Sequence, residues 1–225
     1  RAGAYGIIEG YDDKYYFGRR PNGVYIPRYR NVGGDKRDYL RGFGYQGLAS
    51  REGWSREIPE LGIGAGLKEA LSEPGKWVFG MAAFGETLPY HDNKAFLDKN
   101  KKDKWGLPVL AIDAEIKDNE KKMRRDMVND AVEMLEVAKL KDVASFEPGY
   151  NFGSAIHEMG TARMGRNPAT SVLNSHNQVW DARNVFVTDG AAMVSSACQN
   201  PSLTYMALTA RAADYAFNEL KKGNL

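Results

Sequence analysis

Apolar residues recur at steps of three and four between positions 117 and 140. This spacing predicts a helix over 117–140 with a single apolar face. Methionines supply half of that face, and core packing is its expected use, with a binding groove as the alternative. The opposite face carries balanced charges and is expected to be solvated. The stripe consists of Met123, Met127, Ala131, Met134, Leu135 and Ala138.

Shorter apolar runs precede this helix. Trp77–Phe84 is apolar throughout and follows a Pro-Gly turn, and Leu107–Ile116 alternates apolar and polar positions. Both patterns predict strands. The lysine-rich segment between them, 93–104, is expected to form a surface turn. A short helical piece is predicted at Leu67–Leu71.

Residues 1–56 are rich in tyrosine and arginine. Short strands are predicted around Lys14–Arg19 and Gly23–Arg30, with turns at 21–23 and 33–35. The simplest interpretation is a sheet face whose tyrosines pack and whose arginines are solvated. The alternative is a sugar-binding surface or an interface, because tyrosine and arginine suit both.

The character of the chain changes at about residue 143, where glycines begin to punctuate a loop-rich stretch. A strand is predicted at Asn184–Thr188, and a long alanine-rich helix from Pro201 to about Leu220. Asn200 and Pro201 are residue types favoured at the N-cap and the first helical position. The alanines at 207, 210, 213 and 216 leave a narrow face that can lie close against a sheet.

Charge and composition exclude several classes of protein. A net charge of +2 gives no argument for nucleic acid or an anionic membrane as partner. The single cysteine, Cys198, excludes a disulfide-stapled scaffold. No apolar stretch approaches the ~18–20 residues of a membrane span, so no transmembrane segment is expected. A soluble protein of the cytoplasm or periplasm is expected, and an oligomer is compatible with the sequence. The first residues, Arg-Ala-Gly-Ala-Tyr-Gly, are typical of the middle of a protein and indicate a truncated sequence.

Three histidines are candidates for chemistry: His91, His157 and His176. A His-Glu-x-x-His zinc site would need a second histidine at position 161, which is Thr161, and no Cys/His cluster has metal-ligand spacing. A Gly-x-Ser-x-Gly nucleophile motif is absent as well. Metal and serine hydrolases are therefore weak interpretations, and no metal site is expected. His91 and His176 lie in polar stretches and are assigned no chemistry.

Three linked motifs carry the strongest signal. The run from His157 reads His-Glu-Met-Gly-Thr-Ala-Arg-Met-Gly, the run from Asn184 reads Asn-Val-Phe-Val-Thr-Asp-Gly, and the run from Asn200 reads Asn-Pro-Ser-Leu-Thr. In order and spacing they resemble the C-terminal signature of the glucose–methanol–choline (GMC) oxidoreductases. The resemblance covers 150–220. Residues 1–100 resemble the family more loosely, most like pyranose oxidases and bacterial glycoside or sugar dehydrogenases.

A physical argument for alcohol oxidation stands beside the resemblance. Taking a hydride from an alcohol carbon requires that the hydroxyl lose its proton as the hydride leaves. Histidine, with an unperturbed pKa of about 6.5, suits that task, so His157 is the expected base. Asn200 can hold the alcohol oxygen through an amide that does not titrate. Asn200 can also act as a helix cap, and the two roles are compatible.

The resemblance also implies contacts with FAD. The positive end of the helix that opens at Pro201 could face the flavin edge where negative charge develops. Glycine at the end of the predicted strand would let the backbone approach the cofactor closely. The implied cofactor-binding residues are Asp189, Gly190, Ala191, Asn200, Pro201 and Ser202.

The implied fold class is α+β. Residues 1–142 would form an antiparallel-sheet substrate domain with helices on one side, and 143–225 the C-terminal strand and long helix of a Rossmann-like FAD domain. The stretch Gly62-Ile63-Gly64-Ala65-Gly66 imitates a dinucleotide fingerprint, but Pro59-Glu60 precedes it instead of a strand, so a flexible loop is expected. FAD would be held mainly by residues upstream of this chain, which alone is expected to be inactive.

The implied reaction is oxidation of a CH–OH group, of a sugar or a glycoside, with electrons passing to oxygen, a quinone or a cytochrome. The alternative from another class is a carbohydrate- or partner-binding module without catalysis. In that alternative the tyrosine- and arginine-rich residues 1–56 recognise the ligand, and the pair His157 and Asn200 is a relic.

Overall fold

The computed structural model describes residues 1–11, 23–53, 63–73, 75–149, 152–153 and 156–225. Its contacts divide the chain into two compact units, Arg1–Gly85 with Lys117–Gly149, and Glu86–Ile116 with Tyr150–Leu225. The assignment of 1–142 to a substrate domain and of 143–225 to a FAD domain stays a prediction, because compactness does not reveal which ligand each part binds.

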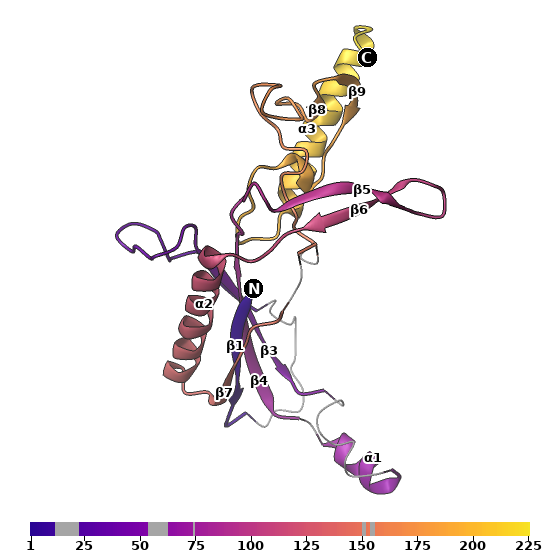
Figure 1. Ribbon diagram of the computed structural model, residues 1–225. Coiled ribbons are helices and arrows are strands. Elements are labelled where there is room, and N and C mark those ends of the chain that lie inside the picture. The colour runs from indigo at the N-terminus through magenta and orange to yellow at the C-terminus, as the bar shows by residue number, and fades with distance from the viewer. Residues whose placement is uncertain (12–22, 54–62, 74, 150–151, 154–155) are drawn as a thin grey trace. The chain divides into compact units, whose positions relative to one another are not determined.

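The first unit is built on a five-stranded antiparallel sheet in the order β2-β3-β4-β1-β7 (Figure 1). Strand β4 confirms the strand predicted at Trp77–Phe84, and β2 lies within the segment predicted at Gly23–Arg30. The strand predicted around Lys14–Arg19 lies outside the described residues. The strands are β1 (Ala2–Ile8), β2 (Val24–Ile26), β3 (Phe43–Arg51), β4 (Trp77–Gly85) and β7 (Lys141–Phe146).

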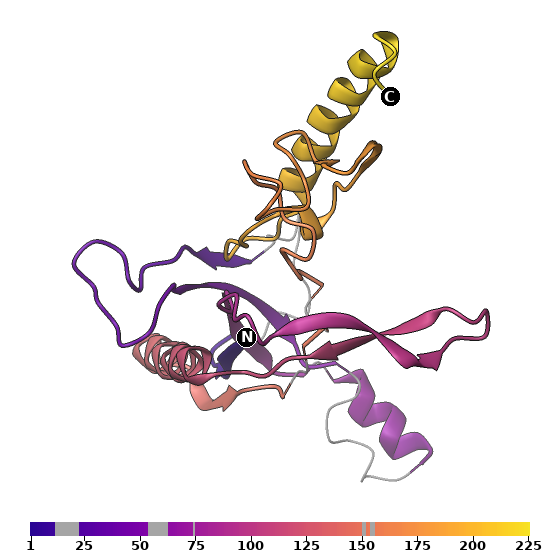
Figure 2. The same cartoon turned by 45° about the horizontal axis from the view of Figure 1, so that its top comes forward.

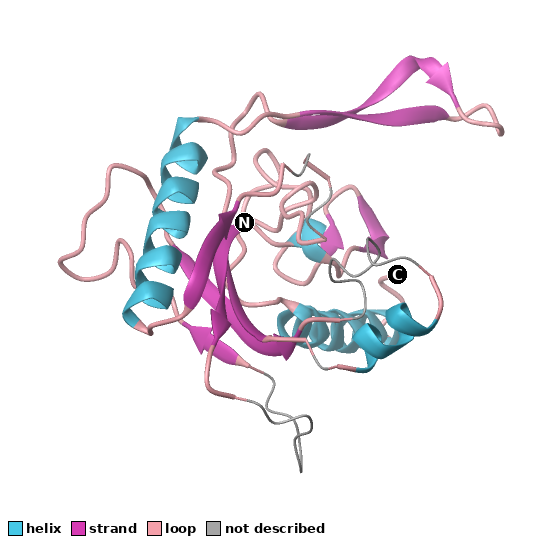
Figure 3. Cartoon of the chain, turned by 90° about the horizontal axis from the view of Figure 1, so that it is seen from below, coloured by secondary structure: helices cyan, strands magenta, loops and turns pink. Residues whose placement is uncertain are grey.

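One face of this sheet is covered by α2 (Asp118–Val137), which packs along β1, β7 and β4 (Figure 3). Because side chains alternate between the two faces of a strand, every second residue of β1, β3 and β4 points to the helix. The stripe faces them from Met123 to Leu135, so the predicted helix is confirmed and this part of its stripe is core rather than a groove, whereas Ala138 is exposed at the C-cap. The buried cluster is Ala2, Ala4, Tyr39, Phe43, Tyr45, Met81, Ala83, Met123, Met127, Ala131 and Leu135.

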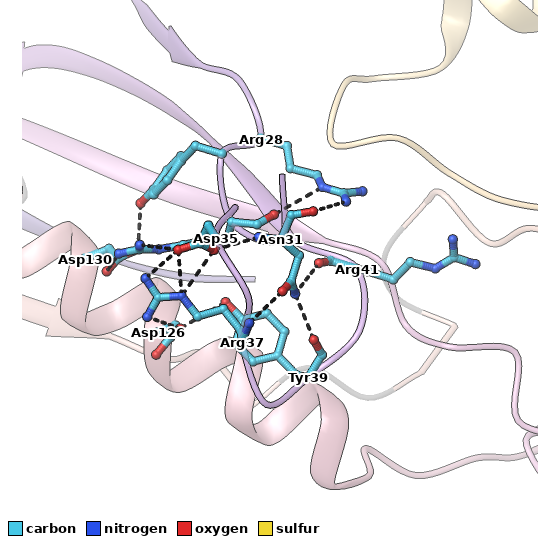
Figure 4. Close-up of polar contacts among 10 residues, drawn as sticks. Arg28, Asn31, Asp35, Arg37, Tyr39, Arg41, Asp126 and Asp130 are labelled. Carbon is cyan, nitrogen blue, oxygen red and sulfur yellow. Dashed lines mark hydrogen bonds and ion pairs between the residues drawn. The ribbon is translucent and has the colours of Figure 1, made fainter. Parts of the chain in front are cut away.

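The charged face of α2 is not solvated throughout, and this corrects the prediction (Figure 4). Asp130 is only 7% exposed. It accepts hydrogen bonds from Arg30 Nη2 and from Tyr29 Oη, both at 2.6 Å. One turn earlier, Asp126 accepts a hydrogen bond from Tyr39 Oη at 3.0 Å. Residues four apart lie on one helix face, so these two carboxylates act together as the acceptors for a single loop.

Asn31 organises that loop, which runs between β2 and β3. Its Nδ2 donates to the carbonyls of Tyr39 and Arg41 at 2.8 Å each, and its Oδ1 accepts from the backbone N–H of Arg37 at 2.8 Å. Asn31 has a φ of 55°, a conformation that asparagine tolerates better than most residues. Part of the tyrosine and arginine that suggested a sugar-binding surface is therefore used to fold this loop onto α2, namely Tyr29, Arg30, Arg37 and Tyr39.

Three tyrosines of this unit are expected to make its stability sensitive to alkali. Burial is the largest cause that raises the pKa of Tyr29, Tyr39 and Tyr45 above the usual value, and hydrogen bonds to Asp130 and Asp126 add to the shift for the first two. The unfolded chain would release these protons from about pH 10, whereas the folded chain holds them. Unfolding then releases protons, so the free energy of unfolding falls as pH rises above about 10.

An alkaline titration followed by tyrosinate absorbance and by circular dichroism checks this expectation. Tyr29, Tyr39 and Tyr45 should ionise together with loss of structure. In Tyr45→Phe the cooperative absorbance step should be smaller. A single gradual titration of all tyrosines in a chain that stays folded would contradict the expectation.

The second unit contains a two-stranded ribbon of β5 (Lys94–Lys102) and β6 (Pro108–Asp113) (Figure 2). Strand β6 confirms the strand predicted at Leu107–Ile116, but the surface turn predicted at 93–104 is wrong. Cross-strand pairs such as Leu97 with Leu110 hold the lysine-rich segment extended, although its own composition does not favour a strand.

The rest of this unit consists of the C-terminal elements. β9 (Ala182–Phe186) starts and ends two residues before the predicted strand, and it pairs with β8 (Gln178–Val179). The 3₁₀ turn η2 (Gly190–Ala192) and helix α3 (Ser202–Lys221) follow. In the first unit, α1 (Ala65–Ser72) includes two residues of the glycine-rich stretch, so that stretch is in part helical rather than all loop.

Helix α3 has two different faces. On one face Ala212 is buried, and Tyr215 stacks on His176 with ring centroids 4.0 Å apart. The other face is exposed within this unit. We call its apolar row the α3 stripe, which consists of Leu203, Met206, Ala210, Ala213, Phe217 and Leu220. The fold is α+β, as predicted: an antiparallel sheet with a helix on one side, and a separate strand and long helix at the C-terminus.

Candidate active site

His157 lies in an irregular segment that is hydrogen-bonded to η2. Three backbone hydrogen bonds join the residues after His157 to η2. The N–H of Gly160 donates to the carbonyl of Gly190 at 3.4 Å. The N–H groups of Ala162 and Met164 donate to the carbonyls of residues 191 and 192 at 3.0 and 2.9 Å. The ring of His157 is partly buried. Two of the three sequence motifs are thus held side by side by backbone contacts rather than by a regular strand pair.

The residues predicted to contact FAD after the strand have structural roles of their own. Asp189 Oδ1 accepts a hydrogen bond from the backbone N–H of Ala191 at 2.9 Å and so caps η2. A Cβ atom added at Gly190 would lie 2.7 Å from the carbonyl oxygen of Glu158 and 2.7 Å from the hydroxyl of Tyr205. Glycine is therefore needed here because two protein segments approach it, whether or not a cofactor does.

Gly190→Ala is expected to displace the His157 segment and to destabilise the chain by about 1–3 kcal/mol, the usual range for an overpacked site. The carbonyl of Glu158 is backbone and cannot move aside cheaply. Urea denaturation measures the loss. Gly149→Ala is a matched control, because a Cβ atom at Gly149 meets nothing within 4 Å. Equal stability of the two variants would show that the close approach at residue 190 relaxes without cost.

Asn200 lies two residues before the start of α3 and is exposed. The structure corrects the predicted capping by one position: Pro201 is the N-cap, Ser202 is the first helical residue, and no side chain caps the helix. Pro201 is buried and holds the start of the helix in place. The first N–H groups of α3 have no acceptor within the helix, which is general for helix starts, so this end can donate to a ligand.

The three motifs converge at Gly190. Its neighbours are the backbone of Glu158, next to His157, and the hydroxyl of Tyr205, in the first turn of α3. The Tyr205 hydroxyl also lies 3.6 Å from Met159 Sδ. The structure thus brings together the segments that carry His157, Asp189–Ala191 and Asn200. It shows no direct hydrogen bond between the side chains of His157 and Asn200 in the described part of the chain.

Sequence reasoning missed the residues that support this convergence. Asn177 is fully buried, donates from Nδ2 to the carbonyl of Val187 at 2.9 Å, and accepts from Arg211 Nη2 at 3.2 Å. It links the end of β9 to α3. Its φ of 63° is a conformation in which asparagine is enriched, but nothing in the sequence marks such a position. His176 stacks on Tyr215.

Within the described ranges, no three His, Cys, Asp or Glu side chains are grouped as metal ligands would be. No helix among these residues is long and apolar enough to cross a membrane.

A family model described as GMC oxidoreductase matches residues 89–209, which is more than half of the chain. The chain therefore belongs to the GMC oxidoreductase family. All three motifs lie within the matched region, His157 and Asn200 included.

Curated relatives act on alcohols and sugars. The 2-methyl-1,2-propanediol dehydrogenase of Mycolicibacterium austroafricanum is 36% identical over 135 residues, 59% of this chain and 24% of the relative. The fructose dehydrogenase large subunit of Gluconobacter japonicus is 28% identical over 181 residues, 80% of this chain and 33% of the relative. The pyranose 2-oxidase of Lyophyllum shimeji is 26% identical over 149 residues, 62% of this chain and 23% of the relative. The chain spans about a quarter to a third of the length of these relatives.

GMC oxidoreductases are flavoproteins, so FAD is the expected cofactor. The donors present here are the Asn200 amide and the uncapped first turn of α3. They suit the polar edge of the flavin ring, where charge develops. No glycine-rich turn between a strand and a long helix, suited to the diphosphate, is found among the described residues. The residues present fit the ring end of the cofactor.

Proposed function

We propose that this chain is the catalytic C-terminal part of a flavoprotein that oxidises a CH–OH group. His157 takes the proton of the alcohol, and Asn200 holds the alcohol oxygen. The observation that carries the proposal is that the family match and the convergence at Gly190 involve the same three segments. Each of those segments contains a residue that the chemistry needs.

The proposed role of each residue follows from the chemistry of its side chain. His157 takes the hydroxyl proton while the C–H bond breaks, and the alcohol carbon becomes a carbonyl carbon. Asn200 donates to the alcohol oxygen and holds the C–H bond in the orientation for transfer. FAD, when bound, accepts the hydrogen and its electron pair as a hydride. The first turn of α3 stabilises negative charge at its N-terminus, with N–H groups that need no reorganisation.

A sugar or glycoside is the proposed substrate class. Two of the relatives are named for the oxidation of fructose and of a pyranose. The third, named for 2-methyl-1,2-propanediol, makes a simple alcohol the competing class. The electron acceptor is proposed to be oxygen, a quinone or a cytochrome.

The α3 stripe is an exposed apolar surface along the long helix. Four large apolar side chains of the stripe are between 56% and 79% exposed. Isolated exposed apolar residues are ordinary, but a continuous row along a twenty-residue helix is typical of an interface. We propose that the remainder of the FAD domain covers the stripe and supplies most contacts to the cofactor.

The chain by itself should therefore bind FAD weakly and show little turnover. Gel filtration of the purified chain after incubation with excess FAD measures retention of the flavin by absorbance. The same treatment of the full-length protein is the control. A stoichiometric yellow complex of the chain alone would contradict the assignment of the main cofactor contacts to other residues.

The decisive experiment is flavin reduction in the full-length protein, followed anaerobically by absorbance against a panel of sugars, glycosides and simple alcohols. Bleaching by a sugar supports both the reaction class and the substrate class. Bleaching by a simple alcohol alone supports the reaction and overturns the sugar assignment. A FAD-loaded protein that no alcohol bleaches would favour a binding module without catalysis.

A further inference from the structure

Glu86 is connected to the segment that carries Asn200, although it lies far away in sequence. Its Oε1 accepts a hydrogen bond from Ser195 Oγ at 2.6 Å and another from the backbone N–H of Ser196 at 3.0 Å. Glu86 is the residue directly after β4, and its side chain is partly buried. It belongs to none of the three motifs.

The segment that it holds has little structure of its own. Between Met193, which ends η2, and Pro201, which caps α3, the backbone forms bends without a helix or a ladder. Irregular backbone of this kind takes its position from specific anchors, because no repeating hydrogen-bond pattern fixes it. At one end the buried Pro201 anchors it. Nearer the other end, Glu86 holds Ser195 and Ser196.

The geometry of the two bonds makes this a directional anchor. Both end on the same carboxylate oxygen, one from a side chain and one from the backbone of the next residue. Two bonds from neighbouring residues restrict orientation as well as position. Hydrogen bonds to a carboxylate are shorter and stronger than neutral ones, and the 2.6 Å contact from Ser195 lies in that short range.

We propose that Glu86 is a positioning residue: by fixing Ser195 and Ser196, it sets the place at which Asn200 presents its amide to the substrate. This inference rests on the proposed function. Only three residues lie between Ser196 and Asn200, so the connection offers few backbone dihedrals that could absorb a shift. Displacement of the anchor is therefore passed on to the amide, and a misplacement of about 1 Å can slow catalysis by as much as 10²-fold.

The test uses the full-length, FAD-loaded protein and a substrate that bleaches it. Glu86→Ala should lower the limiting rate of flavin reduction by roughly 10–100-fold, with FAD content unchanged. Glu86→Gln should stay close to the wild-type rate, because an amide oxygen can accept both hydrogen bonds without a charge. Ser195→Ala, which removes one of the two bonds, should fall between them. The limiting rate and the substrate dissociation constant are measured separately by stopped flow.

A matched control is Glu219→Ala. The Glu219 carboxylate also accepts two hydrogen bonds, from Lys222 and Asn224, but at the far end of α3. The Glu219→Ala variant should leave the limiting rate of flavin reduction unchanged.

The outcomes separate this inference from the function on which it rests. A normal rate in Glu86→Ala, in a protein where His157→Ala is slow, overturns the role of Glu86 and leaves the function intact. A Glu86→Gln variant as slow as Glu86→Ala overturns positioning through accepted hydrogen bonds. Loss of FAD from Glu86→Ala, with a normal limiting rate in the molecules that keep it, overturns the proposal in favour of a structural role. If His157→Ala is itself as fast as the wild type, the proposed function fails first.

Discussion

Replacing His157 by alanine in the full-length protein is expected to slow flavin reduction by roughly 10²–10⁴-fold, the usual scale for loss of an acid–base group. Without the imidazole, the hydroxyl proton must pass to water while the hydride leaves, and that route lacks a base held in place. Substrate binding should change far less than the rate, because the proton moves only in the transition state. Anaerobic stopped-flow absorbance over a range of substrate concentrations separates the two quantities.

Two other histidines provide the controls for this experiment. His91 lies exposed in a turn before β5, and His176 stacks on Tyr215. Neither belongs to the converging segments, so His91→Ala should reduce its flavin at the wild-type rate. His176→Ala should lose some stability but keep the limiting rate. Equal reduction rates in His157→Ala and the wild type would remove His157 from the mechanism.

The largest loss of stability is expected for Asp130→Ala, at about 2–4 kcal/mol. The change leaves Arg30 and Tyr29 without their shared acceptor beneath a loop that folds over α2. The value stands in the lower part of the range for a broken buried ion pair, because the Arg30 side chain is 21% exposed and partly reaches solvent. Urea denaturation of the chain, followed by circular dichroism, gives the difference.

The same helix offers the matched control. Asp118 is 92% exposed on its side chain and lies 3.9 Å from Lys121 in an i,i+3 pair. Asp118→Ala should change the free energy of unfolding by no more than about 0.5 kcal/mol, as is usual for surface positions. Asp130→Asn keeps an acceptor for Tyr29 and Arg30 and should lose less than Asp130→Ala. Equal effects of Asp118→Ala and Asp130→Ala would show that the buried network does not stabilise the fold.

Local periodicity was sufficient for some elements and misleading for others. The helix at 117–140 was predictable because its apolar stripe runs for six positions, and α2 differs from it only at the ends. The strand β5 was not predictable, since its lysines favour a solvated turn and its pairing with β6 is what extends it. The charged face of α2 was misjudged for the same reason. A balanced set of charges does not reveal that Asp126 and Asp130 face a loop that lies about a hundred residues earlier in the chain.

The candidate site likewise contains residues that the sequence predicted and residues that it did not. His157, Asn200 and the Asp189–Ala191 turn could be named because three motifs with fixed order and spacing carry family information within the chain. Their roles in binding FAD and substrate stay predictions. The anchors Asn177, Tyr205 and Glu86 could not be named, because each acts through a contact with a distant segment and has no motif of its own.

The sequence by itself determined the family, and it predicted the reaction class and the residues that would carry it, since all of these depend on residue types at local spacings. It also determined the α+β class through the periods of its apolar positions. The tertiary structure alone decided that tyrosines and arginines of 29–39 fold onto α2, that Gly190 is needed where three segments meet, and that Glu86 anchors the segment before Asn200. These are contacts between residues far apart in the chain, and their partners are chosen by packing and by the cost of leaving buried polar groups unpaired, which no local pattern records.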